Sequence, residues 1–160
     1  MVETLEKNAE VSSDQNDLEL LTFRTGNHEY SVDIMSVREI RGWTRATSLP
    51  HAPNYVRGVI NLRGTVLPVV DLSMRLGLET DEPSDRNVII VVDILGRTVG
   101  MRVDAVSDIL SVPRSSLQAP PGMSADEDQS FVSALTIIEG RMVRVLDLVS
   151  VLPPGTEAAA

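Results

Sequence analysis

The sequence predicts an all-β fold in which a small barrel occurs twice. Short runs of apolar and β-branched residues alternate with glycine or asparagine turns about every ten residues, which is typical of barrels and sandwiches. The order of apolar and polar residues in the first half recurs in the second. Helical signals are short and few. The 160 residues suffice for one ordinary domain or for two small ones that share a core.

Four β-hairpins are expected from this pattern. The first run of apolar residues begins at Leu18, turns at Gly26-Asn27 and continues to Ile34. The other three turns are Arg63-Gly64, Leu95 to Arg97, and Glu139-Gly140. Their strands are expected over residues 56–62, 65–70, 87–94, 98–103, 131–138 and 141–146.

Two short helices are expected after the second and fourth hairpins. Residues 71–77 begin with an aspartate that can cap a helix and end with a glycine. Residues 147–152 also begin with an aspartate and stop before two prolines. Neither segment is long enough to form a helix bundle.

The internal repeat is the most informative feature of the chain. Val37–Ile40 aligns with Val106–Ile109 at an offset of 69 residues, and Gly64–Leu72 aligns with Gly140–Leu148 at an offset of 76. The longer segment Gln118–Ser130 absorbs the difference. Because a unit of half this length has a thin core, we expect the two units to pack together with a cleft between them.

These features predict the domain organisation. We expect a disordered leader over 1–17, a folded region over 18–152 and a flexible tail over 153–160. The folded region should contain sub-barrels at roughly 18–85 and 86–152, with strand exchange between them left open. The acidic segments 79–86 and 118–130 are interpreted as solvated loops, because Asp126–Asp128 lacks the spacing of a calcium loop.

Composition excludes several classes of function. The formal net charge is −9, and one lysine and thirteen arginines are scattered along the chain, so we expect no nucleic-acid partner. No apolar run is long enough to insert into a membrane. The acidic start has no secretory signal pattern, which favours a cytoplasmic location.

Residues with reactive chemistry are sparse. The chain has no cysteine and two histidines, His28 and His51, which are too few for a histidine metal site or a convincing triad. Phosphate-loop, dinucleotide and nucleophile-elbow patterns are also absent. We therefore expect no enzyme, no cofactor and no metal, and a function in binding.

Two places combine charge with apolar residues at strand ends. Glu39 lies in Glu39–Trp43, and Arg63 ends the run Val56–Arg63. A charge pair at such a rim adds about 0 to 1 kcal/mol to stability but can orient a partner. The alternative interpretation is that Glu39 lies on a solvated strand face and that Arg63 only opens a hairpin turn. Trp43 is expected to fill core volume, with partner anchoring as the alternative.

At these residues the sequence resembles the CheW family of chemotaxis coupling proteins. The segments that carry the resemblance cover nearly everything between leader and tail. They are LTFRTGNHEYSVDIMSVREIRGW (21–43), LPHAPNYVRGVINLRGTVLPVVDL (49–72), NVIIVVDILGRTVGMRVDAVSDIL (87–110) and GRMVRVLDL (140–148).

The resemblance implies two five-stranded, SH3-like barrels packed side by side. It implies a non-catalytic adaptor that joins the tips of methyl-accepting chemoreceptors to the regulatory domain of the histidine kinase CheA, at receptor arrays on the membrane. Contacts with further copies of the chain in rings are also compatible with it. The expected receptor groove consists of Val37, Glu39, Arg63, Gly100, Val106 and Ile109.

Two departures limit what the resemblance transfers. Ala134 stands where the family tends to have glycine, and Arg144 occupies a commonly apolar position. Both lie in the last hairpin, so no kinase-binding residue is assigned. A coupling module of another chemosensory or twitching-motility pathway is the main alternative, and an enzyme of unknown type is a third.

Overall fold

The computed structural model describes residues 17–79, 83–120 and 131–153, and within them the chain forms ten strands and four short helical segments. The expected leader except Asp17, which begins β1, most of the tail and the stretch 121–130 lie outside the described residues. The strands are β1 (Asp17–Thr25), β2 (His28–Asp33), β3 (Val37–Gly42), β4 (Val56–Leu62), β5 (Thr65–Asp71), β6 (Val88–Ile94), β7 (Arg97–Val103), β8 (Ala105–Pro113), β9 (Val132–Ile138) and β10 (Arg141–Leu146). The helical segments are η1 (Ile34–Ser36), α2 (Leu72–Arg75), η2 (Arg114–Ser116) and α3 (Leu148–Val151).

The four predicted hairpins are present, and their turns explain the glycines. Each turn has two consecutive residues with positive φ, such as Arg63 at 51° and Gly64 at 89°. Turns of this hand match the twist of the flanking strands, and glycine adopts them at little cost. The local sequence therefore fixes where each hairpin reverses.

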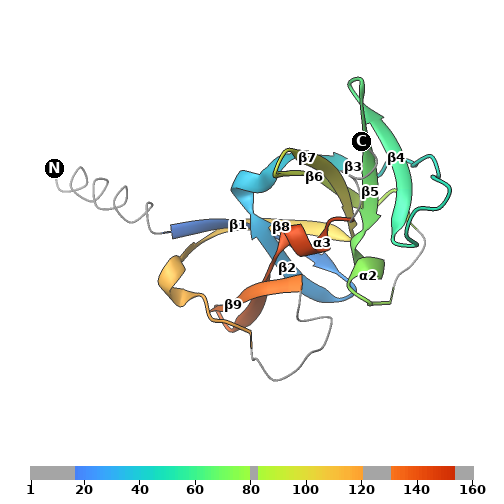
Figure 1. Cartoon of the computed structure of the whole chain (residues 1–160). Helices are drawn as coiled ribbons and strands as arrows, with labels where there is room; N and C mark the ends of the chain where they lie inside the picture. The colour runs from blue at the N-terminus through green and yellow to red at the C-terminus, as the bar shows by residue number, and fades with distance from the viewer. Residues whose placement is uncertain (1–16, 80–82, 121–130, 154–160) are drawn as a thin grey trace.

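The strands form two five-stranded sheets that lie side by side (Figure 1). Barrel I has the strand order β8-β1-β2-β10-β9, and barrel II has the order β3-β6-β7-β5-β4. Bridges join the segments that follow the edge strands β8 and β3 to β9 and β4, at Gln118–Leu135 and Thr47–Val59. These bridges close each sheet into a barrel, which confirms the predicted fold class.

The two halves of the chain exchange strands. The hairpin β1–β2 from the first half completes barrel I with β8, β9 and β10, whereas β6–β7 from the second half completes barrel II. Parallel pairing of β2 with β10 and of β5 with β7 makes these connections. A cut at residue 85 therefore does not separate the barrels, because the strand exchange that was left open between the expected units 18–85 and 86–152 occurs.

The repeat is visible in fine detail. Arg38 in β3 and Ser107 in β8 are bulge residues, which have no partner residue in the neighbouring strand. They are separated by the same offset along the chain as Val37 and Val106. Arg57 in β4 and Ser133 in β9 are a second pair of bulge residues. They are separated by the same offset as the aligned segments Gly64–Leu72 and Gly140–Leu148. Because a bulge bends and twists its strand, equivalent bulges give the two barrels the same curvature.

The core has three parts. A central cluster draws on both barrels, with Phe23 and Tyr30 from barrel I and Met101 from barrel II. Each barrel also has its own smaller cluster. Strand β6 shows how the parts connect, because Ile89 and Ile90 are both fully buried but face barrel II and the central cluster respectively. The central cluster holds the barrels together.

A buried charged group lies beside this core. Asp71 is fully buried and accepts a hydrogen bond from Arg57 Nε at 2.8 Å, while Arg102 Nη1 lies 3.1 Å from its Oδ2 atom. Arg102 also donates to Asn87 Oδ1 at 2.9 Å. Since an isolated buried charge costs several kcal/mol, these partners are needed for Arg102 to lie in the interior.

Arg144, one of the two departures from the family pattern, has a local explanation. Its guanidinium lies 5.5 Å from the centre of the Tyr30 ring. Tyr30 is buried in the central cluster. The arginine therefore covers the outside of an aromatic ring, a role that an apolar residue could also fill.

Candidate functional site

The six residues of the expected groove lie on edge strands, a turn and a central strand. Val37 and Glu39 lie on β3, and Val106 and Ile109 lie on β8. Arg63 is in the turn of the β4–β5 hairpin, which projects from barrel II (Figure 1). The remaining residue, Gly100, lies on the central strand β7 of barrel II.

Val37 and Val106 are brought to equivalent positions. Each begins or nearly begins its edge strand, is half-buried, and packs against the central cluster. That cluster draws on both barrels. We use the word seam for the boundary between the barrels at Val37 and Val106. The chain thus places repeat-related apolar residues from both barrels at one boundary.

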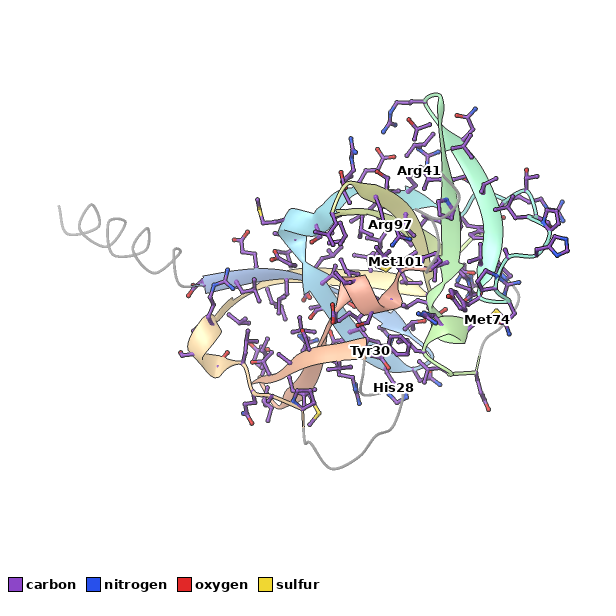
Figure 2. The ribbon with its side chains drawn as sticks, in the orientation of Figure 1. His28, Tyr30, Arg41, Met74, Arg97 and Met101 are labelled. Atoms are coloured by element: carbon purple, nitrogen blue, oxygen red, sulfur yellow. The ribbon has the colours of Figure 1, made fainter. Side chains whose placement is uncertain are left out.

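Glu39 and Arg63 form the ion pair that the sequence suggested. Arg63 Nη2 donates to Glu39 Oε1 at 2.8 Å, and Arg41 Nη1 lies 3.4 Å from Glu39 Oε2. Arg41 extends on the same side of the molecule as the projecting hairpin (Figure 2). The side chain of Arg63 is 70% exposed, so this guanidinium is accessible to a partner.

The pKa of Glu39 is lowered from its ordinary value. The hydrogen bond from Arg63 is the largest cause, and the charges of Arg63 and Arg41 act in the same direction. Glu39 is therefore ionised at neutral pH and is held in one orientation by two arginines. A fixed carboxylate beside an exposed guanidinium gives this part of barrel II a defined charge pattern.

Gly100 does not lie on the accessible surface. It is buried, and a Cβ atom at this position would lie 2.9 Å from Ile89 Cγ2 inside barrel II. Strand β7 is also paired on both sides, with β6 and β5. Gly100 therefore allows close packing inside barrel II, and it is not exposed as Arg63 and Ile109 are.

The exposed apolar residues of the edge strands are also repeat mates. Ile109 on β8 is 57% exposed, and Ile40 on β3 is 46% exposed. Core-forming strands normally turn such side chains inward, so exposed isoleucines on two equivalent edges are informative. Each lies on the same edge strand as one of the two valines, Ile109 with Val106 on β8 and Ile40 with Val37 on β3.

The structure also contains a hollow that the sequence did not indicate. It has a volume of about 370 Å³ and is bounded by the start of β1, the end of β2, η1 and Arg114. Leu18, Ile34 and Met35 supply its apolar lining, and Met35 is 85% exposed. The sequence signal was an apolar pair, Ile34-Met35, directly before Val37, but the opposite wall comes from residues far away in the chain.

Two further findings concern only the described residues. Over 17–79, 83–120 and 131–153, no three acidic or histidine side chains cluster in a way that could hold a metal ion. In the same part of the chain, no helix has the length and apolar character needed to cross a membrane.

The fold and this surface together define the class of protein. Two interlocked five-stranded barrels carry exposed isoleucines on equivalent edge strands and an accessible ion pair on barrel II, which is an arrangement suited to binding another protein. The chain belongs to the CheW-like domain family, whose family model matches residues 19–153.

Relatives of known name are similar over most of the chain. "Chemotaxis protein CheW" of Rhizobium meliloti is 54% identical over 142 residues, which are 89% of this chain and 92% of that protein. "Probable chemotaxis protein CheW" of Rhizobium etli is 50% identical over 86% of this chain and 88% of its own length. The crystal structure of the scaffolding protein TtCheW from Thermoanaerobacter tengcongensis has a TM-score of 0.76 and 31% identity, and the match covers 81% of this chain and 88% of that one.

Proposed function

We propose that the chain is a non-catalytic adaptor of bacterial chemotaxis, which couples methyl-accepting chemoreceptors to the histidine kinase CheA. The observation that supports this proposal is the pair of repeat-related residues Val37 and Val106 at the core cluster that both barrels share, together with the Glu39–Arg63 ion pair on barrel II. Membership of the CheW-like domain family supports the same assignment. The receptor site then consists of Val37, Glu39, Arg63, Val106 and Ile109, and Gly100 supports it from inside barrel II.

A helical receptor tip fits the chemistry of this surface. An amphipathic helix binds by laying its apolar face into an apolar groove, with anchors every three or four residues. Ile109 offers an exposed apolar contact on β8, and Leu18, Ile34 and Met35 offer further apolar contacts in the hollow at the start of β1. The charges of Glu39 and Arg63 then select the orientation of the helix, because rim charges contribute more to specificity than to affinity.

The kinase binds a different surface in this proposal, so one chain holds receptor and kinase together. Tethering two partners raises their effective concentration, and overall affinity gains of roughly 10² to 10⁴ are typical of such linkage. The adaptor works in the cytoplasm beside receptor arrays at the membrane, and further copies can join rings. Each contact can be modest and reversible because the assembly supplies the strength.

A coupling module of a different chemosensory or twitching-motility pathway is less favoured. The relatives with 54% and 50% identity both carry a chemotaxis name. Their similarity extends through most of the folded region and through both barrels.

The receptor site is tested by reversing its rim charges. Glu39→Lys and Arg63→Glu should each weaken capture of a purified chemoreceptor tip in a pulldown, because each removes a fixed charge from the seam. Arg63 is 70% exposed, Glu39 is 26% exposed and neither belongs to a core cluster, so unfolding free energies should stay within about 0.5 kcal/mol of the parent chain.

The matched control is Arg24→Ala, which removes an exposed arginine on β1 that makes no ion pair among the described residues. It should leave receptor capture unchanged. Early melting of the two charge-reversed chains would show that the ion pair is structural, and unchanged capture would remove Glu39 and Arg63 from the receptor site.

A further inference from the structure

Barrel II carries a positive face in a chain that is acidic as a whole. Residues 37–63 contain five arginines and a single acidic residue, Glu39, although the formal net charge of the chain is −9. These residues form β3, β4 and the segment between them. Positive charge is therefore concentrated on one part of one barrel.

The neighbouring carboxylates do not neutralise this face. Glu39 is shared by two arginines, and buried Asp71 is shared by Arg57 and Arg102 at 2.7 and 3.1 Å. Arg38 pairs with Asp93 at 3.3 Å. Arg45 is exposed and has no ion pair or hydrogen bond to any described residue. The guanidiniums thus outnumber the carboxylates that contact them, which leaves a local excess of positive charge.

Two of these arginines line a small hollow together with the only tryptophan. The hollow has a volume of about 210 Å³, and Trp43, Arg45, Ala46, Arg57 and Pro83 line it. Trp43 is half-buried against the core of barrel II, so its ring is fixed on one side and available on the other. Tryptophan and arginine together are typical of residues that dominate binding energy at interfaces.

The backbone holds the hollow in a fixed shape. The amides of Thr47 and Val59 donate to each other's carbonyl oxygens at 2.9 and 2.8 Å, and Trp43 N donates to Asn87 O at 3.1 Å. Gly58 makes the approach possible, because a Cβ there would lie only 2.1 Å from Thr47 O. A preformed site loses little conformational entropy when a ligand binds.

We propose that this hollow binds an aspartate- or glutamate-bearing segment of a partner protein. Arg45 would donate to the carboxylate, since planar guanidinium groups match carboxylates with two hydrogen bonds, and Trp43 would contact the adjoining methylene groups. Arg57 adds positive charge while remaining paired with Asp71.

A single carboxylate fits this arrangement better than a nucleic acid does. Nucleic-acid binding depends on many accessible cations along a backbone, whereas Arg45 is the one arginine of 37–63 without a carboxylate partner among the described residues. The hollow shares no residue with the seam site, so the inference does not depend on the receptor assignment.

Trp43 provides a direct measurement, because it is the only tryptophan in the chain. We expect an acetylated hexaglutamate peptide, titrated into the full chain at low salt, to change tryptophan emission saturably. A hexaglutamine peptide should cause no change. Arg45→Ala should weaken the hexaglutamate affinity by about tenfold or more, since hydrogen bonds to charged groups are strong. Arg24→Ala and Ile109→Asp, which lie outside the hollow, should bind like the parent chain.

Three results would overturn the proposal. One is the absence of a saturable emission change with hexaglutamate. Another is equal affinity in the parent and Arg45→Ala chains, with circular dichroism showing both folded. The third is tighter binding of an oligothymidylate than of hexaglutamate to the same face, which would assign the hollow to nucleic acid.

Discussion

At the scale of single residues, Glu39 is the most constrained group of the seam. Two arginines hold its carboxylate, and the hydrogen bond from Arg63 is the main reason that its pKa is lowered. NMR titration of the Glu39 carboxyl should therefore give a pKa below the ordinary value of about 4.3. In the Arg63→Gln chain the pKa should return toward that value. Equal pKa values in both chains would contradict the ion pair.

The sign of the pH effect follows from the lowered pKa. The folded state binds the Glu39 proton more weakly than the unfolded chain does, so the ion pair stabilises folding at and above the unfolded-state pKa. This contribution is lost as the pH falls through the lower folded-state value. Glu39 should consequently cause no change in receptor binding between pH 5 and 8.

At the scale of elements, Arg75 of α2 joins the two barrels. It donates to the carbonyl oxygens of Ser150 and Val151 in α3 at 2.9 and 3.0 Å. Its guanidinium also lies 4.3 Å from the centre of the Tyr55 ring and 4.9 Å from that of Phe131, residues that are repeat mates in the two units. The last carbonyl oxygens of α3 thus accept hydrogen bonds from Arg75, which belongs to the other half of the chain.

Arg75→Ala should lower the free energy of unfolding by about 1 to 3 kcal/mol, because it leaves helix carbonyls without their charged donor. Urea unfolding gives this quantity from the shift in midpoint at constant slope. The Arg24→Ala chain, whose exposed arginine spans no such boundary, should change by less than about 0.5 kcal/mol. Equal midpoints for the parent and Arg75→Ala chains would show that α3 is held by apolar packing alone.

Hairpins were predictable from the sequence, whereas their grouping into barrels was not. Turns such as Glu139-Gly140 depend on local sequence, since two consecutive residues with positive φ reverse the chain. This reversal does not depend on which barrel the hairpin joins. The exchange depends on parallel pairs between β2 and β10 and between β5 and β7, which lie far apart in the chain. A repeat in sequence shows that two units exist but not which strands each unit contains.

The site was predictable to a similar extent. Family motifs located the edge-strand residues and the Arg63 turn, and an ion pair was a natural consequence of their charges. Gly100 was predicted as a groove residue, and the structure places it inside barrel II, because a motif does not show which face of a strand is buried. The hollow near Met35 required three-dimensional structure, since β1, η1 and η2 converge there from separate parts of the chain.

At the scale of the whole molecule, strand exchange makes the two barrels one folding unit. Each half of the chain supplies two strands to one barrel and three to the other. Neither barrel can close without both halves, and the central cluster is shared. Unfolding should therefore be a single cooperative transition.

Two probes check this cooperativity. Fluorescence of Trp43 reports on barrel II, and far-ultraviolet circular dichroism reports on the strands of both barrels. Their urea transitions should coincide in midpoint and slope. Separate transitions would show that barrel I and barrel II unfold independently despite their exchanged strands.

The central claim is that one chain holds a receptor and a kinase at the same time. Its most direct measurement is size-exclusion chromatography with light scattering on mixtures of this chain, a chemoreceptor signalling fragment and CheA. We predict a three-component complex that contains this chain and does not form in its absence, and that is lost with Arg63→Glu while binding to CheA remains. Mutually exclusive binding, in which added receptor fragment displaces CheA from this chain, would contradict the adaptor function.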